Sequence, residues 1–431
     1  MTRALPRGGT VLLAVLAGTA IADNYALQPA LTEVAADLGV PLSVIGLVPT
    51  AALAGCVAGF ALLLPLADHF APARLIPAQL SALAAALAVA AAAPGAPVLL
   101  TAYLLIGAAA SVAAQAGTIA GRYAPPGRRA GAVATVAAGL SAGILLSRLT
   151  GGALAELLGW RRMLLASAAL ALLGAVAAAA LLPRQRPRTD HGYRRTLAAL
   201  PPLLRRHPPL RHAVAAGGLW YFAFNLVWVA LALALAQPPY SLGPTAIGMY
   251  GLAGLLGLAV LPVTGRLADR HAPRAVITAG LLAAACGAAL LATGLNAPPV
   301  TATGLALCDA GCFAAQAANQ SRVIGLDPRR SGSLNSVYLV LYFMIGAVGT
   351  AVAAPLLAAV GWRGTALTAL AALLAAAVLT HTSRADAARR VPLPVRRAGG
   401  CPAPDGDRAA AAPGTAEGHP GRDSGSRPDD S

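Results

Sequence analysis

Twelve apolar runs, each long enough to cross a lipid bilayer as a helix, divide most of this sequence. A membrane-spanning helix needs about 20 mainly apolar residues, and its backbone polar groups cannot be left unpaired in lipid. Of all residues, 57% are hydrophobic and 11% are charged, against a charged share of about 25% in soluble domains. The sequence therefore predicts an all-α integral membrane protein and excludes a soluble fold. The runs lie near residues 10–28, 43–66, 75–93, 98–120, 130–155, 163–182, 212–236, 246–265, 275–294, 300–321, 333–356 and 364–381.

The two halves of the chain repeat one another. Residues 66–72 (Leu-Ala-Asp-His-Phe-Ala-Pro) recur at 267–273 (Leu-Ala-Asp-Arg-His-Ala-Pro), at an offset of 201 residues. A Gly-Trp-Arg corner at 159–161 recurs at 361–363, and chance is a poor explanation because the chain holds only four Trp. Each copy contains an even number of spans, so both copies have the same orientation in the membrane. Further pairs at the same offset are Asn24 and Asn225, Gln115 and Gln316, Arg128 and Arg329, and Gly131 and Gly332.

The repeat predicts the domain organisation. We expect an N-terminal six-helix bundle over residues 1–182, a cytoplasmic linker over 183–211, a C-terminal six-helix bundle over 212–381 and a disordered cytoplasmic tail over 382–431. The first run follows Arg3 and Arg7 and ends near an Ala-Ile-Ala sequence, which is also typical of a cleavable signal peptide. A retained helix is favoured because its removal would leave eleven spans and break the repeat.

Arginine follows the positive-inside rule along the chain. All 32 basic residues are Arg, and with the N-terminus inside, 28 of them fall in inside segments. Outside loops hold Arg161, Arg162 and Arg363, and Arg148 lies within a span. We therefore expect both termini in the cytoplasm and the protein in the inner (plasma) membrane. The net charge of +16 gives no reason to expect a nucleic-acid partner, because the Arg residues lie in short gaps between spans and at the chain ends.

Several motifs carry a family resemblance. The loop at residues 265–270 (Gly-Arg-Leu-Ala-Asp-Arg) with Arg274, its weaker copy around Asp68 and the Gly-Trp-Arg corners are similar to motifs of the major facilitator superfamily. Residues 143–148 and 319–322 further resemble its bacterial arabinose-efflux-like and drug-efflux-like permeases. The resemblance implies twelve transmembrane helices in two pseudo-symmetric six-helix bundles, which move a small solute by alternating access. We expect a monomer in the lipid bilayer.

The resemblance also implies a gating role for the loops after the second and eighth spans. A carboxylate and Arg residues at cytoplasmic helix ends can pair, and such pairs can break as the bundles rock. The candidate gating residues are Asp68, Gly265, Asp269, Arg270 and Arg274. In the first copy, His69 and Ala71 replace the family's Arg and Gly. The alternative for both copies is charge that only directs topology.

Charged residues deep in a span are costly and are functional candidates by default. Three qualify, namely Asp23, Arg148 and Asp309. Asp23 and Arg148 are predicted at comparable depth, so an ion pair between them is geometrically possible. Such a pair could serve proton coupling, or it could hold the N-terminal bundle together.

A polar stripe follows one face of the tenth span. Asp309, Phe313, Gln316 and Gln320 are spaced by 4, 7 and 11 residues, and Asn319 lies beside them. Ser111, Gln115, Thr118 and Arg122 repeat the spacing in the fourth span. The resemblance implies that both helices line a central cavity, which makes Asp309 a candidate proton carrier. Contact with substrate or protons is favoured over polar contacts that only join helices.

Aromatic residues concentrate in the seventh span. Tyr221, Asn225 and Trp228 follow one face there and would offer an apolar wall with one amide to an amphipathic solute. The alternative is an interfacial aromatic belt, but Asn225 is predicted too close to mid-span for that. The candidate substrate or proton pathway is completed by Asn24, the repeat mate of Asn225.

The preferred function is proton-coupled efflux of a drug, sugar-like or metabolite substrate, with the proton gradient as energy source and no cofactor or metal. A uniporter or importer and a transporter-like receptor are the alternatives, and Tyr103, which replaces a family Arg, counts against proton coupling. An enzyme is not expected. A GxSxG sequence at 139–143 matches a nucleophile elbow, but it lies inside a predicted helix that no His readily reaches. The chain has no Lys and hence no Walker-type ATP site.

Overall fold

The computed structural model describes residues 5, 7–125, 127–185, 202, 204, 207–255, 273–326 and 331–382. These residues form helices joined by short turns, and no strand occurs among them. Eight of the described helices are long and apolar enough to cross a membrane, which confirms the prediction of an all-α membrane protein. The candidate gating residues Gly265, Asp269 and Arg270 lie outside the described residues, as does the tail beyond residue 382.

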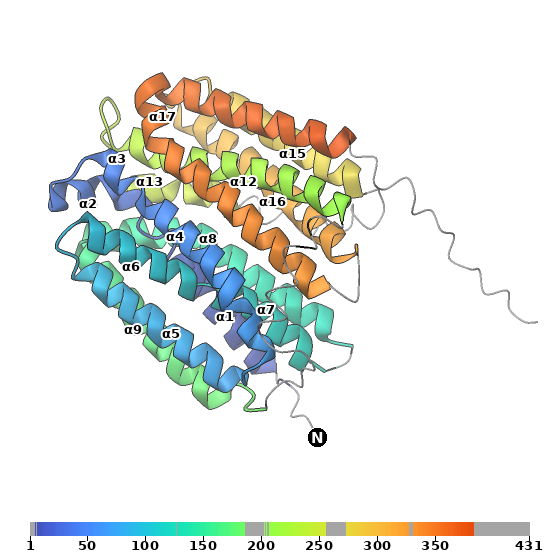
Figure 1. The fold of residues 1–431 in the computed structure, drawn as a ribbon. Coiled ribbons are helices and arrows are strands. Elements are labelled where there is room, and N and C mark those ends of the chain that lie inside the picture. The colour runs from blue at the N-terminus through green and yellow to red at the C-terminus, as the bar shows by residue number, and fades with distance from the viewer. Residues whose placement is uncertain are drawn as a thin grey trace, which may run out of the picture. The chain divides into compact units, whose positions relative to one another are not determined.

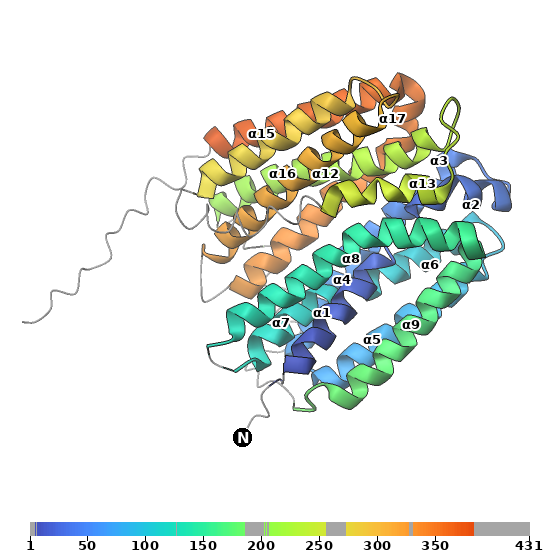
Figure 2. The same ribbon diagram turned by 180° about the vertical axis from the view of Figure 1, so that it is seen from behind.

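The N-terminal half packs its helices in sequence-distant pairs. Helix α1 lies against α8, α4 against α6, and α5 against α9 (Figures 1 and 2). Each pair buries apolar faces dominated by Ala and Leu. The elements are α1 (Arg7–Ala22), η1 (Gln28–Ala30), α2 (Leu31–Leu38), α3 (Leu42–Ile45), α4 (Val48–Leu62), η2 (Leu64–Asp68), α5 (Pro72–Ala91), α6 (Ala96–Ala109), α7 (Val112–Tyr123), α8 (Arg129–Leu158) and α9 (Trp160–Leu181).

The C-terminal half has α17 as its longest element. Helix α17 contacts α12 and α15, and α15 lies along α16 (Figures 1 and 2). Helix α17 contains the predicted eleventh and twelfth spans, which meet at a kink at Gly361. The described elements are α12 (Pro208–Leu235), α13 (Pro244–Met249), α15 (Pro273–Leu291), α16 (Pro298–Ile324) and α17 (Ser331–Thr382).

Each of the twelve predicted runs overlaps a described helix, but the helices do not follow all of the predicted bounds. The first helix ends at Ala22 rather than near residue 28, and the chain turns before η1, where Pro29 lacks the N–H that a continuous helix needs. The fourth run is interrupted between α6 and α7 at residues 110–111. Of the eighth run, only the part up to residue 255 is described.

The repeated Gly-Trp-Arg corners have matching roles. Gly159 and Gly361 have positive φ angles of 81° and 65°, a conformation that side chains other than glycine rarely adopt, and each turns the chain from one span into the next. In the first corner, the Arg161 guanidinium donates to the Ala91 carbonyl over 2.8 Å. In the second, the Trp362 indole donates to the Leu291 carbonyl over 2.7 Å. Both corners therefore fasten the turn to the C-terminal end of α5 or of its repeat mate, α15.

Small residues bring α1 and α8 into backbone contact. A Cβ atom on Gly143 would collide with the Gly18 backbone, and one on Gly18 would lie 2.6 Å from the Gly139 carbonyl oxygen. Gly18, Gly139 and Gly143 thus permit close helix packing inside the N-terminal half.

Candidate functional site

Contacts between the two halves gather at the helix ends that are predicted to face outward. The Thr50 hydroxyl of α4 and the Thr350 hydroxyl of α17 are 2.9 Å apart. At the start of α13, the Thr245 backbone N–H donates to the Glu156 carboxylate of α8 over 3.0 Å. If the N-terminus lies inside, these contacts close the protein on its outer side.

One charged side chain of the N-terminal half is enclosed mainly by aromatic rings at this interface. The Arg148 guanidinium carbon lies 4.1 Å from the Trp228 ring centre, 5.0 Å from that of Tyr25 and 5.6 Å from that of Phe224. These distances allow cation–π attraction, which strengthens when the cation is desolvated. Arg148 is only 2% exposed, and its Nε donates to the Gln28 side chain over 3.2 Å. We call Tyr25, Phe224 and Trp228 the aromatic cage.

A carboxylate from the C-terminal half binds the N–H edge of the same indole. The Trp228 Nε1–H donates to Asp309 Oδ1 over 3.1 Å, and Asp309 is fully buried. Asp309 and Arg148 interact electrostatically, yet these two described residues form no ion pair within 4.0 Å. Asp309 Oδ2 and Arg148 Nη2 are both buried and have no hydrogen-bond partner. The centre thus holds two opposite charges, each with one unused polar atom.

The spacing of these groups depends on a glycine of the eighth span. A Cβ atom on Gly254 would lie 2.5 Å from Asp309 Oδ2. A larger residue there would therefore displace the carboxylate. Arg148, Asp309, Gln28 and the aromatic cage are together called the central cluster.

The possible ion pair between Asp23 and Arg148 is not formed, which corrects one prediction. Asp23 is hydrogen-bonded to Ser167 of α9 and has Tyr103 of α6 as an electrostatic neighbour, so it points into the N-terminal bundle. Its helix ends at Ala22, and the following turn changes the direction of residue 23. Arg148 instead points toward the interface with the C-terminal half, where Phe224 and Trp228 lie.

Aromatic stacking extends the interface beyond the cage. The Tyr25 and Tyr221 hydroxyls are 3.0 Å apart across the two halves. Tyr221 also stacks on Tyr342 with ring centres 4.1 Å apart, and Phe60 meets Phe343 edge-on at 4.8 Å. The predicted aromatic wall of the seventh span is therefore present, and Tyr221 within it packs on another aromatic ring.

Sequence reasoning missed four residues of this region, namely Tyr25, Gln28, Tyr342 and Phe343. Tyr25 and Gln28 had a usable signal, because they closely follow the selected Asn24. Tyr342 had one as well, because it is spaced by four residues from Tyr338, which places both on one helix face. The contact of any of these residues with the opposite half has no signature in one sequence.

Most of the other predicted pathway residues join helices within their own half. In the C-terminal half, Tyr338 donates to Gln316 over 2.6 Å, Asn319 donates to the Ala213 carbonyl over 2.8 Å, and Gln320 donates to Asn335 over 3.0 Å. The polar stripe of α16 is thus divided in this conformation. Asp309 lies at the interface, and the three amides bind neighbouring helices of the same bundle.

The N-terminal counterparts behave similarly. Gln115 donates to the Leu63 carbonyl over 2.7 Å, and Asn24 donates to Cys56 Sγ over 3.2 Å.

Asn225 of the C-terminal half forms no hydrogen bond to a second helix among the described residues. It donates to the Tyr221 carbonyl of its own helix over 2.8 Å, while its Oδ1 is buried without a hydrogen-bond partner. Asn225 therefore keeps an unused, buried acceptor.

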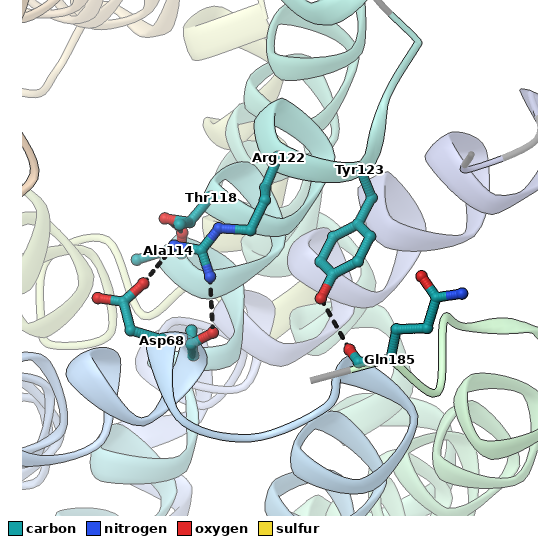
Figure 3. A network of polar contacts seen from close by, with 7 residues as sticks. Asp68, Ala114, Thr118, Arg122, Tyr123 and Gln185 are labelled. Atoms are coloured by element: carbon teal, nitrogen blue, oxygen red, sulfur yellow. Dashed lines mark hydrogen bonds and ion pairs between the residues drawn. The ribbon is translucent and has the colours of Figure 1, made fainter. Parts of the chain in front are cut away.

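The first candidate gating loop is tied to α7. Asp68 forms an ion pair with Arg122, which also donates to the Ala67 carbonyl over 3.1 Å (Figure 3). Next to it, the Tyr123 hydroxyl donates to the Gln185 carbonyl over 2.9 Å, at the end of the N-terminal bundle (Figure 3). These side chains are partly exposed, so the pair itself contributes little stability. In the second loop only Arg274 is described, in the first turn of α15.

A separate groove of about 890 Å³ lies in the C-terminal half. It is bordered by Leu242, Met249 and Tyr250 on one side and by Pro298, Ala302 and Ala306 of α16 on the other. Its lining is almost wholly apolar, and it contains none of the central charges.

Comparison with known proteins agrees with this architecture. A sequence profile described as the Major Facilitator Superfamily matches residues 13–350, which is most of the chain. The chain belongs to the major facilitator superfamily. As a superfamily member, it is a membrane protein with the all-helical fold of two pseudo-symmetric bundles.

Relatives in this superfamily carry transporter names. The chain is 29% identical over 357 residues to "Uncharacterized transporter YgaY" of Escherichia coli O157:H7, covering 83% of this chain and 91% of that protein. It is 31% identical over 355 residues to "Probable transporter SCO4007" of Streptomyces coelicolor, covering 82% of each chain. A crystal structure of a bacterial homologue of the human lysosomal transporter Spinster has a TM-score of 0.70 at 16% identity, covering 86% of this chain and 95% of that one. The last likeness concerns the fold alone.

Proposed function

We propose that this protein is a secondary active transporter that exports a small solute by alternating access, driven by the proton gradient. The observation that carries the proposal is the central cluster, in which Arg148 of one half lies against Phe224 and Trp228 of the other and has Asp309 as an electrostatic neighbour. Ionised groups in the middle of a membrane are costly and mark ion or substrate pathways. The proposal places the monomer in the inner membrane with both termini in the cytoplasm.

The central cluster explains why binding and movement would be coupled. Arg148 and Asp309 are buried between the halves, so solute reaches them only when the halves separate. Separation on the cytoplasmic side leaves the outer contacts, such as Thr50 with Thr350, intact. Rocking in the other sense breaks those contacts and exposes the same residues outward. Each state therefore offers the cluster to one side of the membrane.

Asp309 is the proposed proton carrier. A carboxylate that meets water from alternate sides can take up a proton on one side and release it on the other. Its free Oδ2 accepts the proton, while Oδ1 stays bonded to the Trp228 indole. Protonation removes the negative charge that faces Arg148, which changes how firmly the halves attract each other. The proton gradient can thereby bias the exchange between states.

A sensitivity panel tests the proposal. Cells that express the wild-type chain or Asp309→Asn are grown against a set of drugs and amphipathic metabolites, with cells lacking the gene as baseline. Asp37→Asn is the matched control, because Asp37 pairs with Arg161 at the outer corner, away from the cluster. Resistance that is lost only in Asp309→Asn at equal membrane expression supports the proposal. Resistance unchanged in Asp309→Asn removes this carboxylate from it.

A uniporter is the second candidate, and one observation favours it. Arg148 already balances the charge of Asp309 within the centre, so a neutral solute could pass without a proton. In proteoliposomes, flux of the exported compound would then be the same with the pH gradient present or collapsed by an ionophore. A flux that falls when the gradient collapses supports the proton-coupled mechanism.

A further inference from the structure

The central cluster has two charged side chains that are close but not paired. Arg148 Nη2 and Asp309 Oδ2 have no hydrogen-bond partner, although both residues are more than nine-tenths buried. Buried polar atoms are nearly always satisfied, and unsatisfied ones need an explanation such as a ligand. The Trp228 indole contacts both groups, with its ring face toward Arg148 and its N–H toward Asp309.

Arg148 occupies the place of a ligand in this conformation. The C-terminal half contributes Phe224, Trp228 and the Asp309 carboxylate, which together are the elements of a site for an organic cation. Arg148 fills that site from the opposite half. When the halves separate, the guanidinium leaves with the N-terminal half, and the cation site becomes vacant.

The charges of the cluster limit what can replace the guanidinium. A monocation in the vacant site would leave two positive charges near one carboxylate, in surroundings of low dielectric constant. A monoanion bound to Arg148 would leave Asp309 uncompensated. A zwitterion avoids both costs, because its ammonium group takes the place of the guanidinium beside Asp309 and its carboxylate pairs with the released Arg148.

We propose that the substrate is a small zwitterion with an apolar or aromatic body, of the amino-acid type, held through its ammonium group by Asp309, Trp228 and Phe224 and through its carboxylate by Arg148. The aromatic surroundings of Tyr25, Tyr221 and Tyr342 suit the apolar body. This inference rests on the proposed transport function and adds the substrate class to it.

Matched analogues test the class. Binding to purified protein is measured by calorimetry for the twenty proteinogenic amino acids, and each binder is compared with its amide, which lacks the carboxylate charge, and its deaminated acid, which lacks the ammonium. For phenylalanine these are phenylalaninamide and 3-phenylpropanoate. We expect at least one amino acid to bind at least tenfold more tightly than both analogues. Equal binding of either analogue, or no binding by any of the twenty, would overturn the proposal.

Two variants assign the charges. Asp309→Asn is expected to abolish the preference for the amino acid over the deaminated acid, and Arg148→Gln the preference over the amide. Asp37→Asn and Arg161→Gln, which alter the outer ion pair, are controls that keep both preferences. Variants with uniformly weaker binding and unchanged preferences would show a merely structural role and contradict the assignment.

Flux separates this inference from the proposed function. Each binder is tested for counterflow in proteoliposomes. Counterflow of an amine or an acid, with no preference for zwitterions, leaves transport standing and overturns the substrate class. A zwitterion that binds with the expected preferences but never crosses the membrane supports the binding site and contradicts transport.

Discussion

Locking the outer contacts by a disulfide should stop transport. In the structure the Thr50 and Thr350 hydroxyl oxygens lie 2.9 Å apart, one on each half. A disulfide needs sulfur atoms about 2.05 Å apart and Cβ atoms about 3.5–4.5 Å apart. The hydroxyl distance shows that the two side chains are in contact, so Thr50→Cys with Thr350→Cys is expected to cross-link under oxidising conditions.

The expected loss of flux depends on whether a hydrogen bond or a covalent bond joins the two outer ends. The native hydroxyl pair contributes about 1 kcal/mol, so losing it shifts the equilibrium between closed and open states by only about fivefold. A covalent bond prevents outward opening altogether. Flux then scales with the fraction of molecules left unlinked, so about 95% cross-linking leaves about one twentieth of the rate.

The assay is flux of the exported compound in proteoliposomes, before and after oxidation, with recovery on adding dithiothreitol. The single variants Thr50→Cys and Thr350→Cys control for the native cysteines, and Thr50→Val, whose hydroxyl bonds to Thr350, shows the effect of losing that hydrogen bond alone. Full flux in completely cross-linked protein would refute the reasoning, because the outer ends would then have no need to separate.

Three further changes probe the centre, the packing and the outer surface. Trp228→Phe keeps the ring face under Arg148 but removes the N–H that binds Asp309, so denaturant titrations should show a loss of about 1.5–3 kcal/mol in the free energy of unfolding, as expected for a lost hydrogen bond to a charged group. The control Trp220→Phe removes an indole nitrogen that has no hydrogen-bond partner and should cost less. Equal costs would count against the cluster. Gly143→Leu should abolish the monodisperse peak in size-exclusion chromatography, because the new side chain would collide with the Gly18 backbone. Gly131→Leu is the control, since Gly131 has open space around it, and should remain monodisperse. A monodisperse Gly143→Leu would contradict the packing. Burial and the nearby Glu156 raise the pKa of Glu33, so the ionisation of Glu33 opposes folding, and this cost grows as pH rises above the ordinary glutamate pKa of about 4.3. Between pH 4 and pH 7, the melting temperature should therefore fall less in Glu33→Gln than in wild type. Parallel curves of melting temperature against pH would refute this.

The fold could be predicted from sequence because each part of it has a local or repeated signal. Apolar runs are required wherever a helix crosses lipid, and the offset of 201 residues showed that the halves are copies. The Gly-Trp-Arg corners have similar structural roles because the same three residues form the same turn twice. The early end of the first helix was missed because Asp23 and Asn24 continue the helical spacing, and only Pro29 indicates the break.

The site could be predicted only in part. Arg148, Asp309 and Trp228 were selected because charges in spans and clustered aromatics are unusual, and all three lie in the central cluster. Their partners were wrong or missing, because the contact between Arg148 and Trp228 joins two halves that no local pattern relates. Polar residues such as Gln316 and Asn319 look alike in sequence whether they face a solute or a neighbouring helix, and here both bind other helices.

The measurement that tests the central claim most directly is electron–electron double resonance on two spin-labelled pairs. Ser43 and Ser241 are exposed at the ends predicted to face outward, and Arg128 and Ser321 are exposed at the opposite ends. Each pair is labelled in a protein whose five cysteines are replaced, at low and high pH and with Asp309→Asn as a mimic of the protonated carboxylate. The account predicts that the outer pair moves apart as the inner pair comes together under at least one of these conditions. A single unchanged distance distribution for both pairs under all of them would contradict it.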